Sequence, residues 1–236
     1  MPARNKRTAR STRLALAALL TTFALAGCTD AAARTTEGSA VSGPTLSIAD
    51  ARVAVESLTV KGRAPKTGYA RSEFGESWTD DVDVAGGHNG CDTRNDILAR
   101  DLTAVTFKPG THDCVVLTGE LADPYTGKVI DFTRGQGTST AVQIDHVVAL
   151  SDAWQKGAQQ LTARERTNLA NDPRNLLAVD GPANQQKSDS DAASWLPSNK
   201  SFRCTYVSKQ VEVKAAYNLW VTQGEKDAMI RVLDAC

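Results

Sequence analysis

The stretch AVQIDHVVALSDAW, residues 141–154, constrains the fold of this chain more than any other segment. Its apolar residues predict a mostly buried strand. An ionisable pair, Asp145 and His146, interrupts that apolar run. Burying a carboxylate is strongly unfavourable unless a partner compensates it. The fold must therefore bring a compensating group to this strand.

The N-terminal 28 residues are typical of an export signal. Basic residues without any acid occur in residues 1–13, residues 14–27 are apolar or small, and Cys28 completes the sequence LAGC. This pattern predicts a signal peptide, since the apolar run is short of the roughly 20 residues of a membrane-spanning helix. LAGC resembles a bacterial lipobox, which implies a lipidated Cys28 and an outward-facing membrane anchor. The alternative is an ordinary signal peptide and a secreted protein.

A linker and a single domain follow the signal. Residues 29–46 are small, polar and punctuated by Gly and Pro, which predicts a flexible tether. We expect one folded domain over residues 47–236. The whole chain has 27 basic and 27 acidic residues; without the signal, 22 basic residues stand against 27 acidic ones. A protein that bound nucleic acid by charge alone would be basic, so such binding here needs a local site, with a bound cation.

Four cysteines besides Cys28 predict two disulfides. They are Cys91, Cys114, Cys204 and Cys236, an even number that suits an oxidising compartment. Of the three connectivities, we favour Cys91–Cys114 and Cys204–Cys236, because each pair lies within one sequence region. No C-x-x-C motif is present, so a structural zinc site is not expected.

Periodicity and capping signals predict an α+β domain. Capping boxes begin at Ser47 and at Thr162, and an Asp-Pro turn joins two extended runs into a hairpin. We expect helices over residues 48–62, from Asp92 or Thr93, over 151–161, from 162, over 182–196 and within 206–235. We expect strands over residues 104–107, 114–121, 128–133, 141–150 and 174–181.

Three of these pieces resemble the core of HNH endonucleases. A strand carries Asp145-His146, a second strand opens with Asn175, and a helix carries Asn184 nine residues later. DHVVAL and NLLAVDGPANQQKSD are similar to the two halves of the family motif, and the N-x-x-K-S-D ending resembles the HNH domain of CRISPR effector nucleases. GCDTRNDILARDL and the hairpin resemble actinobacterial secreted HNH proteins related to the C-terminal domain of GmrSD-type restriction enzymes. The likeness covers roughly residues 47–236.

The resemblance implies a ββα-metal core with added helices and a β-hairpin. His146 would be the general base, and Asn175 would orient its imidazole through the side-chain oxygen. Adjacent strand residues point to opposite faces, and in the family a bend or bulge brings both Asp and His towards the helix. The segment between His146 and Asn175 is long, so Asn168 and Asn171 remain alternatives to Asn175.

The same resemblance implies a metal site. Asp145 and Asn184 would hold a divalent cation, and their oxygen atoms favour Mg²⁺ or Mn²⁺ over Zn²⁺. That cation would be the group that compensates Asp145. Lys187, one helical turn beyond Asn184, either touches a phosphate or is a solvated helix residue. Arg94 either reaches the active site or pairs with Asp92 or Asp96.

The implied function is metal-dependent hydrolysis of phosphodiester bonds by an exported monomer. DNA is the favoured substrate, and RNA is also compatible. Two alternatives remain open: a non-catalytic lipoprotein that keeps the HNH fold to bind nucleic acid or the envelope, and a structural envelope protein in which the motif merely packs.

Overall fold

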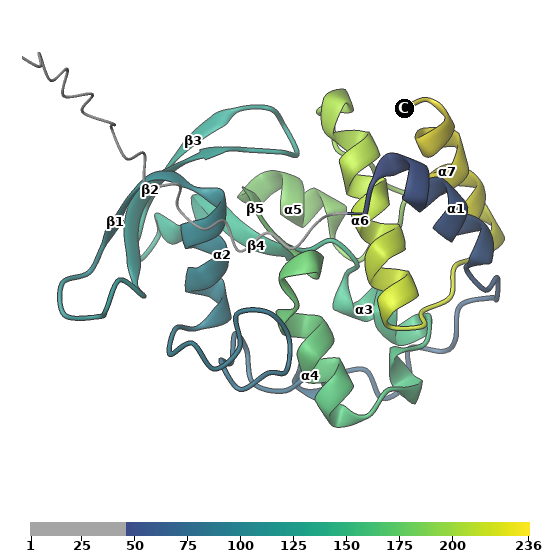
Figure 1. Ribbon diagram of the computed structural model, residues 1–236, viewed down its shortest axis with the longest axis horizontal. Helices are drawn as coiled ribbons and strands as arrows, with labels where there is room; N and C mark the ends of the chain where they lie inside the picture. The colour runs from purple at the N-terminus through teal and green to yellow at the C-terminus, as the bar shows by residue number, and fades with distance from the viewer. Residues whose placement is uncertain (1–45) are drawn as a thin grey trace, which may run out of the picture. The chain divides into compact units, whose positions relative to one another are not determined.

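The computed structural model describes residues 46–236, so the predicted signal peptide, Cys28 and nearly all of the linker lie outside the described residues (Figure 1). The described chain is an α+β domain. None of its helices is both long and apolar enough to cross a membrane. The helices are α1 (Ile48–Ser57), α2 (Thr93–Asp101), α3 (Leu150–Gln155), α4 (Ala163–Asn171), α5 (Gly181–Lys187), α6 (Arg203–Ala216) and α7 (Gln223–Asp234). The strands are β1 (Thr103–Phe107), β2 (Val116–Ala122), β3 (Val129–Thr133), β4 (Val142–His146) and β5 (Leu176–Asp180).

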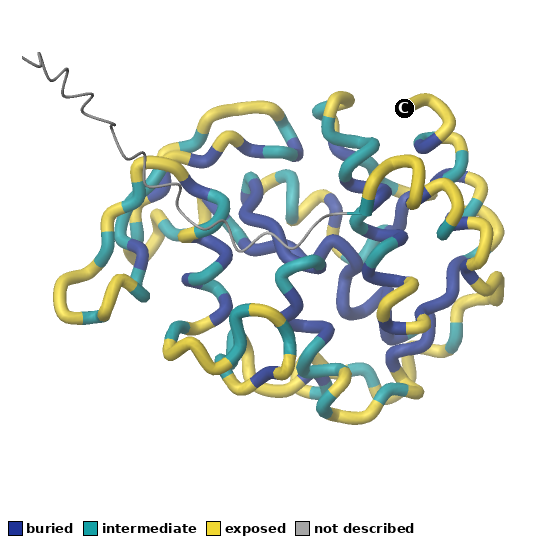
Figure 2. Tube along the Cα trace, in the orientation of Figure 1, coloured by how far each residue is buried: buried dark blue, intermediate teal, exposed yellow. Residues whose placement is uncertain are grey.

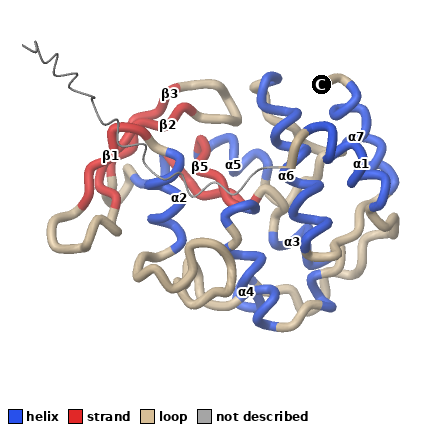
Figure 3. Tube along the Cα trace, in the orientation of Figure 1, coloured by secondary structure: helices blue, strands red, loops and turns tan. Residues whose placement is uncertain are grey.

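The strands form two separate antiparallel sheets, which lie in one half of the described domain (Figure 3). One sheet has the order β1-β2-β3 and contains the predicted hairpin, β2-β3. The other pairs β4 with β5, from Val142 opposite Asp180 to His146 opposite Leu176. Helix α5 begins directly after β5 and packs against both strands. The strand with the Asp-His pair, the second strand and the following helix therefore come together as a unit.

Burial explains why β4 and β5 hold their place. Both strands are dark blue at the centre of the tube in Figure 2, and nearly every residue in them is buried. Val142, Ile144, Leu176 and Ala178 share an apolar cluster with residues of α2 and β2. A second cluster joins α1, α6 and α7 and reaches Leu177 from the other side. These two apolar clusters thus pack on opposite faces of the strand pair that carries Asp145 and His146.

Both predicted disulfides are confirmed. Cys91 is bonded to Cys114 and Cys204 to Cys236. Both predicted capping boxes also begin helices: Ser47 accepts from the backbone of Asp50, and Thr162 exchanges hydrogen bonds with Glu165. Local sequence therefore determined these helix starts.

Several helices end earlier than their sequence pattern predicts, because distant segments bind the backbone. α1 stops at Ser57 rather than near Gly62, since Val60 bridges to Val221. The helix predicted over 182–196 ends at Lys187. Ser188 then adopts a φ of 52°, in the left-handed region.

A buried cluster of charges joins the helical half of the domain. Lys156, with no exposed surface, lies 2.7 Å from Asp152, 2.8 Å from Asp191 and 2.6 Å from Glu225. Lys214 adds contacts to Asp152 and Glu225. Asp191 lies just beyond α5, and its ion pair with Lys156 holds the chain after Lys187 close to α3, α6 and α7. This contact accounts for the early end of α5.

Candidate active site

Asp145 is buried on β4 and has two hydrogen-bond partners. Its Oδ1 lies 2.9 Å from the Lys187 Nζ, and its Oδ2 accepts a hydrogen bond of 2.5 Å from the Tyr125 hydroxyl. Burial raises the pKa of the Asp145 carboxyl, and the Lys187 ammonium and the Tyr125 hydroxyl oppose that rise. Burial and the neighbouring carboxylate raise the pKa of Tyr125 well above its ordinary value, so its hydroxyl keeps its proton. Two donors, one on each oxygen, thus hold the Asp145 carboxyl group in place.

Lys187 is buried between α5 and β4 and has neither of the two roles that the sequence left open. Its ammonium has no exposed surface, and it donates to Asp145 and, at 2.9 Å, to the backbone oxygen of His146. Neither predicted alternative, a phosphate contact or a solvated residue, agrees with this burial. The sequence predicted a metal ion as the group that compensates Asp145; in the structure the Lys187 ammonium is the cation that contacts its Oδ1.

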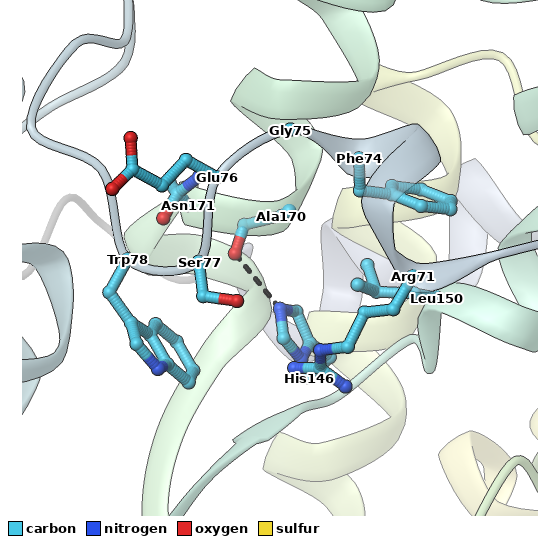
Figure 4. Close-up of a pocket in the computed structure, with 10 residues that line it drawn as sticks. All are labelled: Arg71, Phe74, Gly75, Glu76, Ser77, Trp78, His146, Leu150, Ala170 and Asn171. Carbon is cyan, nitrogen blue, oxygen red and sulfur yellow. Dashed lines mark hydrogen bonds between the residues drawn. The ribbon is translucent and has the colours of Figure 1, made fainter.

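His146 faces the other side of β4. The pairing of β4 with β5 runs without a bulge, so the predicted bend is absent and adjacent side chains leave opposite faces. The His146 Nε2 lies 2.9 Å from the backbone oxygen of Ala170, shown by the dashed line in Figure 4. A carbonyl can only accept, so Nε2 carries the proton, and Nδ1 has a lone pair without a partner among residues 46–236. The ring stacks on Trp78 with 5.7 Å between centroids.

The electrostatic environment keeps the imidazole neutral. Burial, and then the charge of Arg71, lower the pKa of His146 to about 3. A hollow of about 20 Å³ beside the ring is lined by Arg71, Ser77 and Asn171, among others (Figure 4). That space holds about one water molecule. The Oδ1 of Asn171 is buried and lacks a partner among the described residues, so it offers an acceptor there.

Asn175 is buried but does not touch the imidazole. Its Oδ1 accepts from the Val148 backbone N–H at 2.8 Å, and its Nδ2 donates to the Val148 and Leu169 oxygens. The predicted contact between its side-chain oxygen and His146 is therefore wrong in this structure. Asn175 instead fixes the backbone that follows β4, and Ala170 supplies the oxygen that orients the ring.

Asn184 lies on α5 beside β4. Its Nδ2 donates to the Oε1 of Gln143 at 2.9 Å. Its Oδ1 has no hydrogen-bond partner among the described residues. Asn184 and Asp145 line the same cleft, so two oxygen donors named from the sequence do come together.

That cleft has a volume of about 650 Å³, and its lining carries charges of both signs. Lys66, Arg71 and Arg94 line it together with Asp145, His146 and Asp189, and Lys66 pairs with Asp189 at 3.2 Å. Arg94 forms no ion pair in the described part of the chain, so neither of its predicted partners, Asp92 and Asp96, binds it. Arg71 also lacks a carboxylate partner among residues 46–236. Two guanidinium groups are therefore available to an anion beside His146.

The donor set is compatible with a hard divalent cation. Mg²⁺ binds through one or two carboxylates, keeps several waters and accepts substrate phosphate oxygens. Asp145 and the Oδ1 of Asn184 supply oxygen, and each carboxylate oxygen retains a lone pair after its one hydrogen bond. Within residues 46–236 no three His, Cys, Asp or Glu side chains gather as a metal site. A cation here would thus depend on water and substrate for most of its ligands.

Five lining or supporting residues were missed by sequence reasoning. One had a usable signal: Gln143 precedes Asp145 by two positions, so strand alternation puts it on the same face. The others come from distant loops, and only the tertiary fold brings them to β4. The missed residues are Lys66, Arg71, Trp78, Tyr125 and Gln143.

Comparison with known proteins places the chain in a family. The model of the family described as GmrSD restriction endonucleases, C-terminal domain, matches residues 92–232. The match spans more than half of the chain, and the chain belongs to this family. An "Uncharacterized secreted protein" from Arthroderma benhamiae (strain ATCC MYA-4681 / CBS 112371) is 35% identical over 192 residues, which cover 80% of this chain and 86% of that protein. No solved structure matches significantly.

Proposed function

We propose that this protein is an exported, metal-dependent endonuclease of the HNH type that hydrolyses phosphodiester bonds, with DNA favoured over RNA as substrate. The family favours a nuclease-type function. The observation that carries the proposal is the neutral His146, whose Nδ1 has no partner among the described residues, in a cleft that it shares with Asp145, Arg71 and Arg94. The unit β4-β5-α5 serves as the ββα core of this site.

His146 acts as the general base. Its Nδ1 takes a proton from a water that attacks phosphorus, while Ala170 holds the Nε2–H and so fixes the tautomer. The hollow beside the ring has room for that water. Stacking on Trp78 keeps the ring from rotating. A positioned base of this kind typically contributes about 10²- to 10⁴-fold to the rate.

The cations of the cleft bind the substrate backbone. Arg71 and Arg94 present guanidinium groups whose planar forks suit phosphate oxygens. Lys187 keeps Asp145 in place and ionised and has no part in substrate contact. A divalent cation held by Asp145 and Asn184 would polarise the scissile phosphate and stabilise the leaving oxygen.

Export is supported by two observations. The two disulfides suit an oxidising compartment, and the relative from Arthroderma benhamiae is named a secreted protein. We further propose anchoring through a lipidated Cys28. Replacing Cys28 by Ser should release the protein from the membrane fraction or leave its signal uncleaved; an unchanged fractionation would contradict the lipid anchor.

The test is cleavage of supercoiled plasmid and of RNA by the purified protein, with Mg²⁺, with Mn²⁺ and with EDTA. His146→Asn should lower the rate about 10²- to 10⁴-fold, and EDTA should abolish cleavage. His112→Asn is the matched control, because His112 is exposed in a loop with a φ of 50°, which Asn tolerates. Equal rates for His146→Asn and the control would refute the general base.

One observation favours a second function. The Lys187 ammonium already neutralises Asp145, as it would in a cleft that binds nucleic acid without cutting it. Such a binding protein would retain plasmid in a mobility assay with EDTA and would not nick it with any metal. Nicking that depends on both His146 and metal would exclude this alternative.

A further inference from the structure

Two polar residues on one face of β4 contact two polar residues on one face of α5. Gln143 and Asp145 are two apart on the strand and share a face. Asn184 and Lys187 are three apart on the helix and also share a face. Gln143 contacts Asn184, and Asp145 contacts Lys187. The helix is thus tied to the strand by one polar pair at each position.

In the contact between Gln143 and Asn184, the donor and the acceptor can be assigned. The backbone oxygen of Thr140 can only accept, and it lies 3.5 Å from the Nε2 of Gln143. This fixes the Gln143 amide so that its Oε1 faces Asn184. An oxygen can only accept from the Asn184 Nδ2, at 2.9 Å. The Oδ1 of Asn184 is therefore the atom of that amide that is left without a partner among the described residues.

The hydrogen bonds from Asn184 to Gln143 and from Gln143 to Thr140 form a relay. The close approach of α5 to β4 fixes the distances in this relay. A Cβ built on Gly181 would lie 2.2 Å from the Thr140 oxygen and 3.1 Å from the Gln143 Nε2. Only glycine allows the first turn of α5 to sit directly on the Thr140 carbonyl. The distance between Gln143 and Asn184 is consequently set by backbone packing, and a different side chain at position 143 cannot be compensated by a shift of the helix towards β4.

We propose that Gln143 is a positioning residue for the metal site: through the relay from Thr140, it turns the Oδ1 of Asn184 towards the divalent cation. This inference rests on the proposed function, because it assumes that Asn184 is a ligand. Without the Gln143 Oε1, the Asn184 amide is free to rotate and can present its NH₂ group, which cannot bind a cation. Groups that orient a metal ligand in this way typically affect metal affinity about 10- to 100-fold.

The test is calorimetric titration of Mn²⁺ into the purified protein without substrate. Gln143→Thr suits the strand but is too short to reach Asn184, and it should weaken Mn²⁺ binding about tenfold or more. Gln143→Glu keeps an acceptor oxygen for the Asn184 Nδ2 and should retain affinity or increase it. Gln223→Thr is the control, since Gln223 is exposed and bonds only Asp227. Thermal midpoints of all variants should stay close to that of the original protein.

The outcomes separate the inference from the function on which it rests. If Asn184→Ala loses Mn²⁺ binding while Gln143→Thr binds normally, Asn184 is a ligand and the positioning role of Gln143 is wrong. An equal loss in Gln143→Thr and Gln143→Glu would also overturn it, because the acceptor oxygen would not matter. If the original protein binds no Mn²⁺, the metal site fails, and the role of Gln143 with it.

Discussion

Replacing Lys187 by Met tests the most unexpected contact of the site. The substitution keeps the volume of the side chain but removes the ammonium that lies 2.9 Å from the Asp145 Oδ1. Lys187 has no exposed side-chain surface and Asp145 has 6%. Asp145 would then be a buried charge with only the Tyr125 hydroxyl as a side-chain partner. We expect a large loss of stability.

The magnitude follows from the burial. Removing one partner of a buried ion pair typically costs about 3–5 kcal/mol, because the other charge stays desolvated. For a domain of this size each kcal/mol lowers the Tm by about 2–4 °C, so the expected drop is roughly 6–20 °C. Asp145→Asn in the same chain removes the stranded charge, so the double variant should recover much of that loss. The two substitutions should therefore be strongly non-additive.

Thermal unfolding followed by circular dichroism measures this. The control is Lys66→Met, since Lys66 and Asp189 form an exposed pair 3.2 Å apart, with 51% and 45% of the side-chain surface exposed. That pair should contribute no more than about 1 kcal/mol. If Lys187→Met unfolds at the same temperature as the control, the buried pair is not what holds Asp145.

Four further predictions concern the cleft and its scaffold. Because burial and Arg71 lower the pKa of His146 to about 3, the acid limb of the pH–rate profile should lie well below pH 6.5; a limb at 6.5 would show an exposed imidazole. The same shift makes stability fall as pH drops from about 6.5 towards 3, where the unfolded chain binds the proton more readily, and His146→Asn should flatten that fall. Arg94→Ala should reduce the salt dependence of DNA binding by about one phosphate contact; an unchanged slope would place Arg94 off the substrate path. Replacing Cys204 and Cys236 by Ser should destabilise the protein by about 2–5 kcal/mol in chemical denaturation, and a smaller effect would show that α6 and α7 hold that end without the bond.

Local signals in the sequence predicted the elements well. Capping residues at Ser47 and Thr162 marked helix starts, and pairing by sequence region gave both disulfides. Helix ends were predicted less well. Periodicity cannot reveal that Val60 will pair with Val221, or that the charge cluster will pull the chain after Lys187 away from the helix.

In the candidate site, too, local sequence predicted some features, and contacts between distant segments determined the others. Motif spacing singled out Asp145, His146 and Asn184, and all three line one cleft. The spacing gave the helix face on which Lys187 lies but not what stands opposite that face. Tyr125 follows the Asp-Pro pair of the predicted turn, and Arg71 lies outside every helix and strand that the sequence predicted. Their positions depend on how distant segments pack, so their contacts to Asp145 and His146 could not be derived from local pattern.

The pairing of β4 with β5 also bears on the order in which the protein folds. His146 pairs with Leu176, so residues 147–175 must be spanned before the two strands meet, whereas only residues 123–128 separate β2 from β3. Closing the longer loop costs roughly 1 kcal/mol more in chain entropy, and contacts between distant residues slow folding. By this criterion the strand pair that carries Asp145 and His146 closes after the β2-β3 hairpin. The cleft that these two residues line would therefore form later than that hairpin.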